Sequence, residues 1–278
     1  MSNIIIKSSK NIKLDNRSKY LRQLIIDCLE NEGRGHIGAA FSLVEIIRTL
    51  YDYILKFKSK KIDYSKRDRF ILSKGHGCLA LYVMLYDKGF IKKKDLLSVG
   101  KVNSILGGHP EHTIPGVEVS TGALGHGYPF ACGMALAARI KKEKHFIFTV
   151  MGDGEINEGS VWETALSVSK HNLLNLITII DFNKLQSYGP TKEVSDLHSL
   201  KKKWESFGFK VFEVNGHDIK KLKQIFINAK KQKIKPVTII CHTIKGKGLS
   251  FAEGKPEWHH KSMITQNQIY EMKRELYK

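Results

Sequence analysis

The central part of the chain alternates apolar runs with short polar turns. Residues 145–151 form an apolar, β-branched run of strand length that stops at Gly152-Asp153-Gly154. Residues 158–169 then have helical spacing, and a second apolar run, 173–180, ends at Asp181-Phe182-Asn183. Short apolar strands joined through a helix predict a parallel sheet that is covered on both faces, with a right-handed crossover.

The same alternation extends along most of the chain. Helices are expected at residues 17–31, 42–55, 78–88, 127–140, 200–207 and 218–231, and strands at 68–73, 210–214 and 236–241. This order predicts an α/β fold with a doubly wound, mostly parallel sheet and helices on both faces. We expect residues 1–16 to be a surface extension and residues 17–278 to form a single domain.

Two short patterns predict helix starts. Ser42 with Glu45, and Thr265 with Gln268, have the S/T-x-x-E/Q spacing of a capping box, in which the first side chain bonds an amide of the first turn. We therefore expect one helix to open at residue 42 and the last helix at residue 265. Residues 103–127 are glycine-rich and lack helical spacing, which is typical of a long functional loop.

Polar side chains follow both central strands. Asp153 and Asn183 would lie beyond the carboxyl ends of neighbouring strands, where open α/β sheets bind ligands. A carboxylate, an amide oxygen and a backbone carbonyl near Leu185 suit a hard cation such as Mg²⁺. Gly152 and Gly154 allow a phosphate to approach closely, and the next helix points its first amides at the same place. The pattern predicts a metal-bridged diphosphate site.

The balance of charge is strongly basic. Among 278 residues, 46 Lys and Arg oppose 27 Asp and Glu, which gives a formal net charge of +19. Such a charge can indicate a nucleic-acid or membrane partner, or a cavity for phosphorylated substrates. The lysines occur mostly in short scattered groups, such as 92–94 and 201–203, which favours solvated helix faces and loops over a nucleic-acid surface.

Cysteine spacing and hydropathy limit the classes of protein to which the chain could belong. The four cysteines lack CxxC spacing, so we expect buried free thiols in a reducing compartment and neither a zinc site nor a disulfide framework; they are Cys28, Cys78, Cys132 and Cys241. The first apolar run is too short for a signal peptide, and no stretch reaches the length of a membrane span. We expect a cytoplasmic protein without membrane association.

The segment GDGEINEGSVWETA at residues 152–165, followed by Asn183 at the end of an apolar strand, resembles the thiamine-diphosphate signature of the transketolase family. In that family the positions of Asp153, Asn183 and the Leu185 carbonyl bind the divalent metal of the diphosphate. The resemblance implies thiamine diphosphate and Mg²⁺, or another divalent cation such as Ca²⁺ or Mn²⁺. It also places Gly152, Gly154 and Glu158 on the diphosphate side of the cofactor.

Four further segments carry histidines in the family order. They resemble transketolase motifs and read GRGHIG at 33–38, DRFILSKGHG at 68–77, GHPEHTIPGVEVSTGALGHG at 108–127 and HTIKGKGLSFAEGKPEWHHK at 242–261. The resemblance implies that His36 and His109 contact substrate and that His76 reaches the cofactor and the reacting carbon. It further implies that Gly122 and Leu124 pack against the cofactor, and that His259 lies near the diphosphate and the substrate.

As a set, these four histidines are the predicted catalytic residues. Imidazoles can hydrogen-bond and exchange protons with sugar hydroxyls near neutral pH. A histidine metal cage is the rival interpretation, but none of the four has the close spacing usual for zinc ligands. Two positions depart from the family pattern, because His126 stands where many members carry Gln and His260 replaces the usual Gly.

The resemblance runs from about residue 17 to residue 260 and covers only the first part of a full transketolase. Full-length members continue with a pyrimidine-binding domain, which carries the glutamate that activates the cofactor, and with a carboxy-terminal domain. We therefore expect the amino-terminal subunit of a split transketolase, paired with a separate chain that carries both domains, in a heterotetramer.

The implied reaction transfers a two-carbon ketol (glycolaldehyde) unit from a ketose phosphate to an aldose phosphate, as in the pentose phosphate pathway. Thiamine, and not a protein side chain, would be the nucleophile. One alternative is another thiamine-diphosphate enzyme, such as a deoxyxylulose phosphate synthase-like enzyme or a ketol transferase of sugar biosynthesis. A second alternative, motivated by the charge, is a non-catalytic basic binding module.

Overall fold

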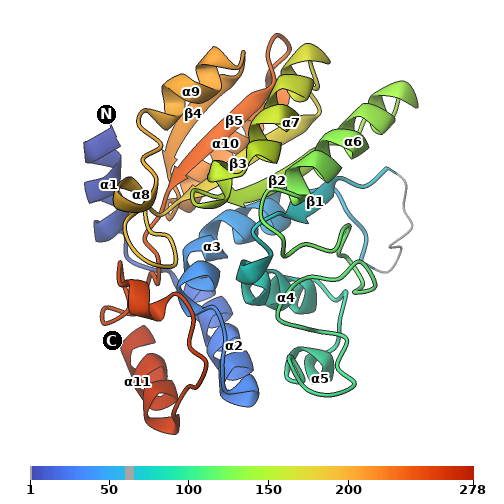
Figure 1. Ribbon diagram of the computed structural model, residues 1–278. Helices are drawn as coiled ribbons and strands as arrows, with labels where there is room; N and C mark the ends of the chain where they lie inside the picture. The colour runs from blue at the N-terminus through green and yellow to red at the C-terminus, as the bar shows by residue number, and fades with distance from the viewer. Residues whose placement is uncertain (1, 60–65) are drawn as a thin grey trace.

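A parallel sheet forms the centre of the molecule (Figure 1). The computed structural model describes residues 2–59 and 66–278. Within them the sheet has the spatial order β1-β2-β3-β5-β4, and all four pairings are parallel. Its strands are β1 (Arg69–Leu72), β2 (Ile147–Gly152), β3 (Leu176–Phe182), β4 (Lys210–Asn215) and β5 (Val237–His242).

Helices cover both faces of this sheet (Figure 1). One hydrophobic core joins the strands to α6 (Gly127–Ile140), α7 (Gly159–Lys170) and α9 (Leu200–Ser206). The other core contains residues of α2 (Asn16–Glu32), α3 (Ile37–Thr49), α4 (Cys78–Asp87) and α10 (Ile219–Lys231). The doubly wound α/β prediction is confirmed.

Shorter elements connect these layers. A π-helical turn, Leu50–Ile54, follows α3, and single 3₁₀ turns lie at Gly75–Gly77, Glu155–Asn157 and Pro256–Trp258. The remaining helices are α1 (Ser2–Asn11), α5 (Lys93–Leu96), α8 (Thr191–Val194) and α11 (Gln266–Leu276).

The strands explain why their sequences are almost wholly apolar. On β2, Phe148 and Val150 belong to one core, whereas Ile147 and Met151 belong to the other. Because successive side chains point to opposite faces, a strand buried on both sides must be apolar at nearly every position.

The strand order also explains the two helical layers. The chain moves in one direction across the sheet from β1 to β2 to β3 and on to β4, and then returns to place β5 between β3 and β4. A right-handed crossover that runs backwards must lie on the opposite face. This is why α10, which joins β4 to β5, packs in the other core from α6, α7 and α9.

One of the two predicted capping boxes is wrong. The helix expected from residue 42 already begins at Ile37, and Ser42 and Glu45 lie inside it, fully buried. The Ser42 hydroxyl donates to Asp181 at 2.7 Å, and Glu45 pairs with Arg22 at 2.6 Å, so tertiary partners satisfy both side chains. The other capping box is confirmed, since the Thr265 hydroxyl accepts from the Gln268 amide at 3.2 Å.

The amino-terminal segment, predicted as a surface extension, contains α1. The Ser9 hydroxyl is buried and donates to the carbonyl of His242 at 2.8 Å, so α1 lies beside the end of β5. The four cysteines are free thiols, but Cys132 is half-buried, so the expectation of burial was wrong for this one. Cys132 is partly exposed because it lies towards the outer side of α6.

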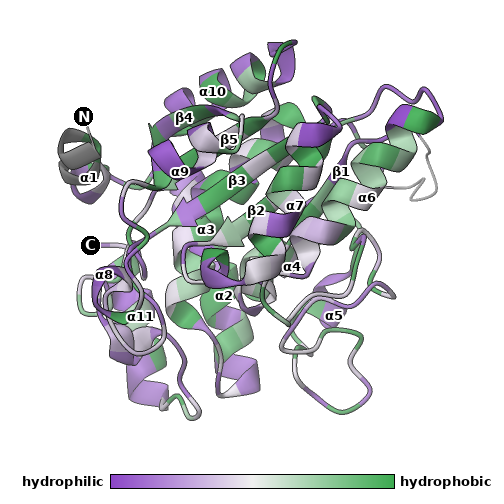
Figure 2. Ribbon diagram, turned by 45° about the horizontal axis from the view of Figure 1, so that its top comes forward, coloured by the Kyte–Doolittle hydropathy of each residue, from purple (hydrophilic) through white to green (hydrophobic). Residues whose placement is uncertain are grey.

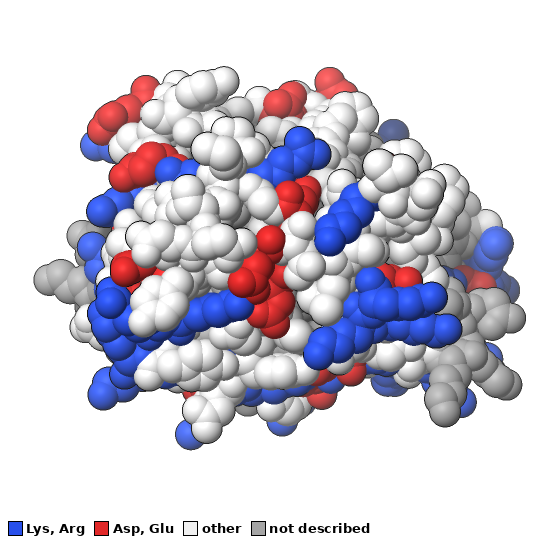
Figure 3. Space-filling model, turned by 90° about the horizontal axis from the view of Figure 1, so that it is seen from below, with Lys and Arg blue, Asp and Glu red and all other residues white. Residues whose placement is uncertain are grey.

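Charged side chains are interspersed on the surface seen in Figure 3. Lys and Arg form separate groups on this face, with acidic side chains gathered between them and wide uncharged areas around them. The positive charge is therefore not collected in one continuous patch on this side of the molecule. Among the described residues, no helix has the length and apolar content needed to cross a membrane.

Candidate functional site

A cavity of about 390 Å³ lies at the carboxyl ends of β2 and β3. Its wall contains nine of the ten residues predicted to bind the cofactor. These are His76, Leu124, Gly152, Asp153, Gly154, Glu158, Asn183, Leu185 and His259. The tenth, Gly122, lies outside this wall and faces the His109 ring, which a Cβ at Gly122 would approach to 3.2 Å.

Asp153 is a buried acid of this cavity. One carboxylate oxygen accepts from the Gly154 amide at 3.0 Å, and the other accepts from the Lys184 amide at 2.6 Å and the Thr191 hydroxyl at 3.1 Å. Burial and the nearby Asp181 carboxylate raise the pKa of Asp153 to about 6. A cation placed beside this carboxylate would favour its ionised form.

Asn183 and Leu185 bring two further oxygens to the same place. The Asn183 side-chain oxygen accepts from the Leu185 amide at 3.1 Å, and the Leu185 carbonyl accepts from the Lys245 ammonium at 2.9 Å. Between them Lys184 has a left-handed backbone with φ of 66°. This turn lets the Lys184 amide donate to Asp153 while Asn183 and Leu185 both line the cavity.

The donor set fits a divalent metal and a diphosphate. Carboxylate, amide and carbonyl oxygens are hard ligands of the type that Mg²⁺ prefers. In addition, Gln186 Nε2 and His259 Nδ1 are buried and have no hydrogen-bond partner among the described residues. Both residues line the cavity, so a polar ligand bound there could satisfy atoms that the protein leaves unpaired.

Two lysines that the sequence analysis did not single out bring ammonium groups to the cavity wall. Lys74 and Lys245 are 1% and 3% exposed and line its wall. The Lys74 ammonium lies 2.6 Å from the Asp181 carboxylate, and burial together with Lys74 lowers the pKa of Lys245 to about 8. Lys74 occupies the turn after β1, within the DRFILSKGHG segment, and Lys245 lies in the TIKGKG stretch. Both segments resemble family motifs, so the sequence could have indicated both lysines as site residues.

Glu155 fixes the long loop against this cavity. Its buried carboxylate accepts from the Gly125 amide at 3.0 Å and from the Gly152 amide at 3.1 Å. The first of these amides belongs to the loop at residues 103–127 and the second to the end of β2. The Glu155 carboxylate therefore holds Leu124 at the cavity wall. From the sequence, Glu155 could only be assigned to the diphosphate motif.

The four predicted histidines converge on one cluster from four separate loops. The His36 ring centroid lies 5.5 Å from that of His76, 5.4 Å from that of His259 and 6.2 Å from that of His109. His76 and His259 are 5.6 Å apart. A second cavity of about 260 Å³ is lined by His36, His76, His109 and His260, and His76 lines both cavities. The histidine cavity thus adjoins the cavity of Asp153.

Burial keeps three of these histidines, His36, His76 and His259, neutral. It lowers the pKa of His36 to about 4, with a further contribution from His260, and that of His259 to about 3, with a further contribution from Lys245. Burial and Lys74 also lower the pKa of His76 well below its ordinary value. At neutral pH these rings are imidazoles that can both donate and accept hydrogen bonds.

The two unusual histidines differ in their surroundings. His260 lines the histidine cavity, and its ring lies 4.5 Å from that of His36. The loops of these two residues are joined where Gly35 and Lys261 exchange backbone hydrogen bonds of 2.9 and 3.0 Å. His126 is exposed and contacts the Leu124 carbonyl at 3.0 Å, outside both cavities.

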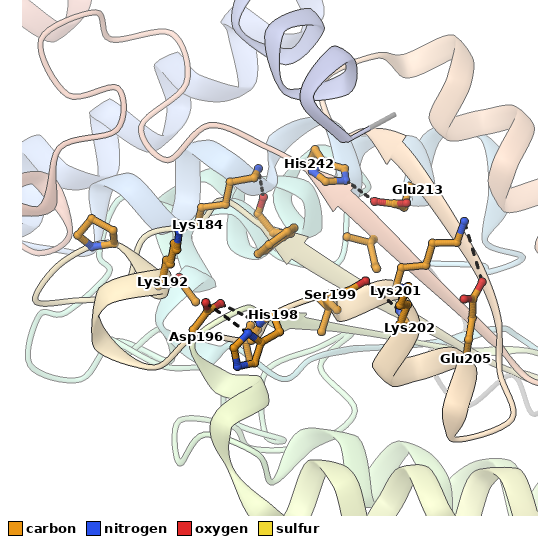
Figure 4. Close-up of a pocket in the computed structure, with 16 residues that line it drawn as sticks. Lys184, Lys192, Asp196, His198, Ser199, Lys201, Lys202, Glu205, Glu213 and His242 are labelled. Atoms are coloured by element: carbon orange, nitrogen blue, oxygen red, sulfur yellow. Dashed lines mark hydrogen bonds and ion pairs between the residues drawn. The ribbon is translucent and has the colours of Figure 1, made fainter.

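A larger cavity of about 590 Å³ lies beyond Lys184 and contains none of the predicted site residues (Figure 4). Several of its polar side chains are paired with protein groups. His242 contacts Glu213 at 3.0 Å, and the Lys184 ammonium donates to the Phe182 carbonyl at 3.1 Å. Size alone does not identify the functional cavity here. His242 Nδ1 in the larger cavity is buried and unpaired as well, but the convergent oxygens of Asp153, Asn183 and Leu185 line the smaller one.

The fold and the smaller cavity are those of an α/β protein that binds its ligand at the carboxyl ends of parallel strands. Residues 15–277 match the family described as "Transketolase, thiamine diphosphate binding domain". The chain therefore belongs to the transketolase family and has its thiamine diphosphate binding fold.

Related chains of similar length are named as subunits of transketolases. The chain is 41% identical to a subunit of the apulose-4-phosphate transketolase of Phocaeicola vulgatus, over 95% of this chain and 93% of the relative. It is 43% identical to the subunit of the same name from Actinobacillus succinogenes, over 90% and 91%. Identity to the 6-deoxy-6-sulfo-D-fructose transketolase subunit of a Clostridium species is 35%, over 93% and 94%.

Solved transketolases have the same fold but are longer. The enzyme from Leishmania mexicana superposes with a TM-score of 0.88 at 30% identity, over 96% of this chain and 42% of that one. The enzyme from Campylobacter jejuni gives a TM-score of 0.88 at 31% identity, over 94% and 42%. The chain thus spans about two fifths of the length of these transketolases.

Proposed function

We propose that this chain is the amino-terminal, thiamine diphosphate-binding subunit of a transketolase that transfers a two-carbon ketol unit from a ketose phosphate to an aldose phosphate. The observation that carries the proposal is the adjacency of two cavities through His76, one with the oxygens of Asp153, Asn183 and Leu185 and the other with four histidines. An anchoring site for a diphosphate and a set of hydroxyl-binding groups thereby face the same space.

In this proposal, Asp153, Asn183 and the Leu185 carbonyl hold Mg²⁺ or a similar divalent cation. Lys245 would move from the Leu185 carbonyl towards a phosphate oxygen, since a metal ion would repel its ammonium from that carbonyl. Gln186 and His259 would use their unpaired nitrogens on the cofactor. When bound, thiamine diphosphate supplies the nucleophilic carbon that accepts the two-carbon unit.

The histidines act on the sugar. As neutral imidazoles, His36, His76 and His259 can each donate one hydrogen bond to an oxygen and accept one from a hydroxyl. His109, on the long loop, lines the same cavity as His36 and would contact the same sugar. Such preorganised donors stabilise negative charge as it develops on the reacting oxygen and fix the orientation of the substrate.

A separate chain would complete the enzyme. Relatives of the same length are named as subunits, and this chain spans two fifths of the solved transketolases, which supports a partner that supplies a pyrimidine-binding and a carboxy-terminal domain in a heterotetramer. A reducing cytoplasmic location belongs to the proposal because the chain has four free thiols.

The proposal specifies a reaction class and phosphorylated sugar substrates. The pentose phosphate pathway offers such substrates, but the related subunits are named for apulose 4-phosphate and for 6-deoxy-6-sulfo-D-fructose. We therefore propose ketol transfer between sugars and leave the particular sugar to product analysis with several donors.

The decisive experiment measures binding and turnover separately. Isothermal titration of the isolated chain with thiamine diphosphate should show binding that requires Mg²⁺, and Asp153→Asn should weaken it about 10- to 100-fold. The matched control is Asp196→Asn in the larger cavity, with an expected change of less than about twofold because Asp196 does not line the smaller one. Circular dichroism establishes that both variants are folded.

Turnover is then assayed after mixing with the co-expressed partner chain. Xylulose 5-phosphate should serve as donor, and pyruvate should not; efficient use of pyruvate would favour the synthase-like alternative. Full ketol transfer by the single chain, or cofactor binding that is indifferent to divalent cations and to Asp153→Asn, would contradict the proposal.

A further inference from the structure

The larger cavity, of about 590 Å³, is separate from the cofactor cavity and from the histidine cavity. Its wall comes from β3, β4 and β5, from the segment that contains α8, and from α9 (Figure 4). Small-molecule sites usually have volumes of about 300–1,000 Å³ and combine apolar surface with a few polar groups that fix the ligand. The larger cavity has this size, and its side chains indicate what it would bind.

Apolar side chains form part of this wall. Leu197, Leu200 and Ile240 belong to the core on the α9 side of the sheet, and each also lines the cavity. In Figure 2, α9 combines green and purple segments, because Leu200 is buried whereas Lys201 and Lys202 are exposed. The carbon skeleton of a ligand could therefore contact apolar surface that lies next to lysines.

The acidic side chains of this wall already have partners in the protein. Each of the three lies within hydrogen-bonding or ion-pair distance of a basic residue or of a backbone amide. The pairs are Glu213 with the His242 ring at 3.0 Å, Glu205 with Lys201 at 4.0 Å, and Asp196 with the His198 amide at 2.8 Å. These carboxylates therefore do not call for a cationic ligand.

Three lysines of the wall differ from these acids in having no counter-ion. Lys184, Lys192 and Lys202 form no ion pair with an acidic side chain in the part of the chain that the structure describes. The Lys184 ammonium donates to the Phe182 carbonyl at 3.1 Å and lies 4.7 Å from the centre of the Phe182 ring. An ammonium group has three hydrogens, so it can donate further hydrogen bonds. The excess of ammonium groups favours an anionic ligand.

His242 adds a second requirement. It lines the cavity and is only 1% exposed, and its Nδ1 has no hydrogen-bond partner among the described residues. Because the Glu213 carboxylate accepts from Nε2, that nitrogen carries the hydrogen, and burial together with Lys184 lowers the pKa of the ring. In the neutral ring Nδ1 is an acceptor. Buried polar atoms are rarely left unpaired, so a ligand with a hydroxyl group would satisfy this one.

We propose that the larger cavity is a second binding site of this chain, for a small phosphate monoester that also carries a hydroxyl group. The ammonium groups of Lys184, Lys192 and Lys202 bind the phosphate, and the hydroxyl donates to His242 Nδ1. A phosphate monoester has close to two negative charges at neutral pH, which matches several ammonium groups better than a single carboxylate does.

This site and the cofactor cavity lie on two sides of one segment. Lys184 and Thr191 line the larger cavity, while the Lys184 amide donates to Asp153 at 2.6 Å and the Thr191 hydroxyl donates to it at 3.1 Å. Asp153 itself lines only the cofactor cavity of these two. A ligand in the larger cavity therefore does not occupy the place of the cofactor, and both can be bound at once.

The test is isothermal titration of the chain with glycerol 3-phosphate, in the absence of thiamine diphosphate and in the presence of saturating thiamine diphosphate and Mg²⁺. Propyl phosphate is the control ligand, because it has the same charged group and no hydroxyl. We expect glycerol 3-phosphate to bind under both conditions, about tenfold more tightly than propyl phosphate, which is the effect of one hydrogen bond to a buried acceptor.

Substitutions assign the binding to this cavity. Lys192→Met and Lys202→Met, both at exposed positions, should weaken the binding of both ligands about tenfold. Lys203→Met is the matched control, since Lys203 is next to Lys202 on α9 but does not line the cavity, and the expected change is less than about twofold.

His242→Phe should abolish the preference for glycerol 3-phosphate over propyl phosphate. Its control is His145→Phe, which removes another buried imidazole whose Nδ1 is unpaired but which lies outside the cavity, and which should keep the tenfold preference. Circular dichroism establishes that these variants are folded. If either buried substitution prevents folding, the exposed lysine variants and the two ligands still decide the outcome.

Three results would overturn the proposal. The first is that glycerol 3-phosphate does not bind at millimolar concentration, and the second is that wild-type protein binds both ligands equally well. The third is binding that thiamine diphosphate prevents and that Lys192→Met and Lys202→Met leave unchanged, because the ligand would then occupy the cofactor cavity. The titration without thiamine diphosphate does not depend on the proposed function, so failure of one proposal is distinguished from failure of the other.

Discussion

The ammonium of Lys74 lies 2.6 Å from the carboxylate of Asp181, and neither side chain is more than 2% exposed. The Ser42 and Thr243 hydroxyls donate to the same carboxylate. Although burial opposes its ionisation, Lys74 and these hydrogen bonds hold the pKa of Asp181 below its usual range. The pair ties the turn after β1 to the end of β3, and Lys74 is also part of the cofactor cavity wall.

Removing one partner of this pair should therefore be costly. Lys74→Met leaves a buried carboxylate without its counter-ion, and we expect the free energy of unfolding to fall by about 3–5 kcal/mol. Urea denaturation of the isolated chain measures this change. Lys201→Met is the control, because its 4.0 Å contact with Glu205 is half-exposed, and the expected loss is below about 1 kcal/mol. Equal effects of the two substitutions would contradict the interpretation.

Gly75 should not tolerate a methyl group. A Cβ at this position would lie 2.7 Å from the backbone oxygen of Thr121, which cannot move without shifting the long loop. We expect Gly75→Ala to lower the free energy of unfolding by about 1–3 kcal/mol. Gly133→Ala is the matched control, since nothing lies within 4 Å of its Cβ and alanine favours a helix by about 0.8–1 kcal/mol over glycine. Thermal unfolding should move in opposite directions for the two variants.

The neutral state of His36 predicts a dependence of stability on pH. Its pKa of about 4 in the folded protein is below the value of about 6.5 expected in the unfolded chain, so between these values the unfolded state binds the extra proton. Stability is then lost as the pH falls from about 6.5 towards 4. Because solvent screens this partly exposed ring, we expect about 1 kcal/mol from His36 between pH 7 and pH 5.

The substitution His36→Gln separates the contribution of His36 to the pH dependence of stability from the contributions of other groups. Urea unfolding at pH 7 and pH 5 should show a smaller loss of stability in the variant than in the wild type, by about the amount given above. The control is His198→Gln, because His198 is exposed and remote from the histidine cavity. Identical pH dependence of the wild type and His36→Gln would show that the imidazole is not held neutral by the fold.

His260 should limit the size of the sugar that the enzyme accepts. Its ring borders the histidine cavity of about 260 Å³, at a place where other family members usually have glycine. In the complex with the partner chain, His260→Gly should improve kcat/KM for longer acceptor sugars by about 10-fold relative to short ones, a change typical of one altered pocket contact. The variant His126→Gln, which alters the other unusual histidine outside both cavities, should leave this ratio unchanged.

Much of the fold could be predicted because its signals are local. Helix α6 begins and ends as predicted from residues 127–140, and the Asp218 side chain caps α10 through the Lys221 amide, as expected. The strand boundaries differ from the predicted ones by up to three residues, since apolar residues such as Leu173 pack in the core just before a strand as well as inside it. Periodicity does not distinguish these two kinds of buried position.

The misplaced helix start at Ser42 has a different cause. The S-x-x-E spacing is local, but the partners that decide its role, Asp181 and Arg22, are remote in sequence. The same limit applies to Lys74 and Lys245, whose charges face the cavity only after distant strands have been assembled. The oxygens of Asp153 and Asn183 could be anticipated because they follow adjacent parallel strands.

The position of β5 has a consequence for synthesis of the protein. Strand β5 is the last of these strands in the sequence, but in the sheet it lies between β3 and β4. Strands β3 and β4 therefore do not pair directly with each other. A growing chain that has emerged from the ribosome only as far as β4 holds two unpaired strand edges, and the gap closes when residues 237–242 arrive. The sheet therefore cannot be completed during translation until the chain has been made as far as His242, and until then the exposed edges are open to incorrect pairing.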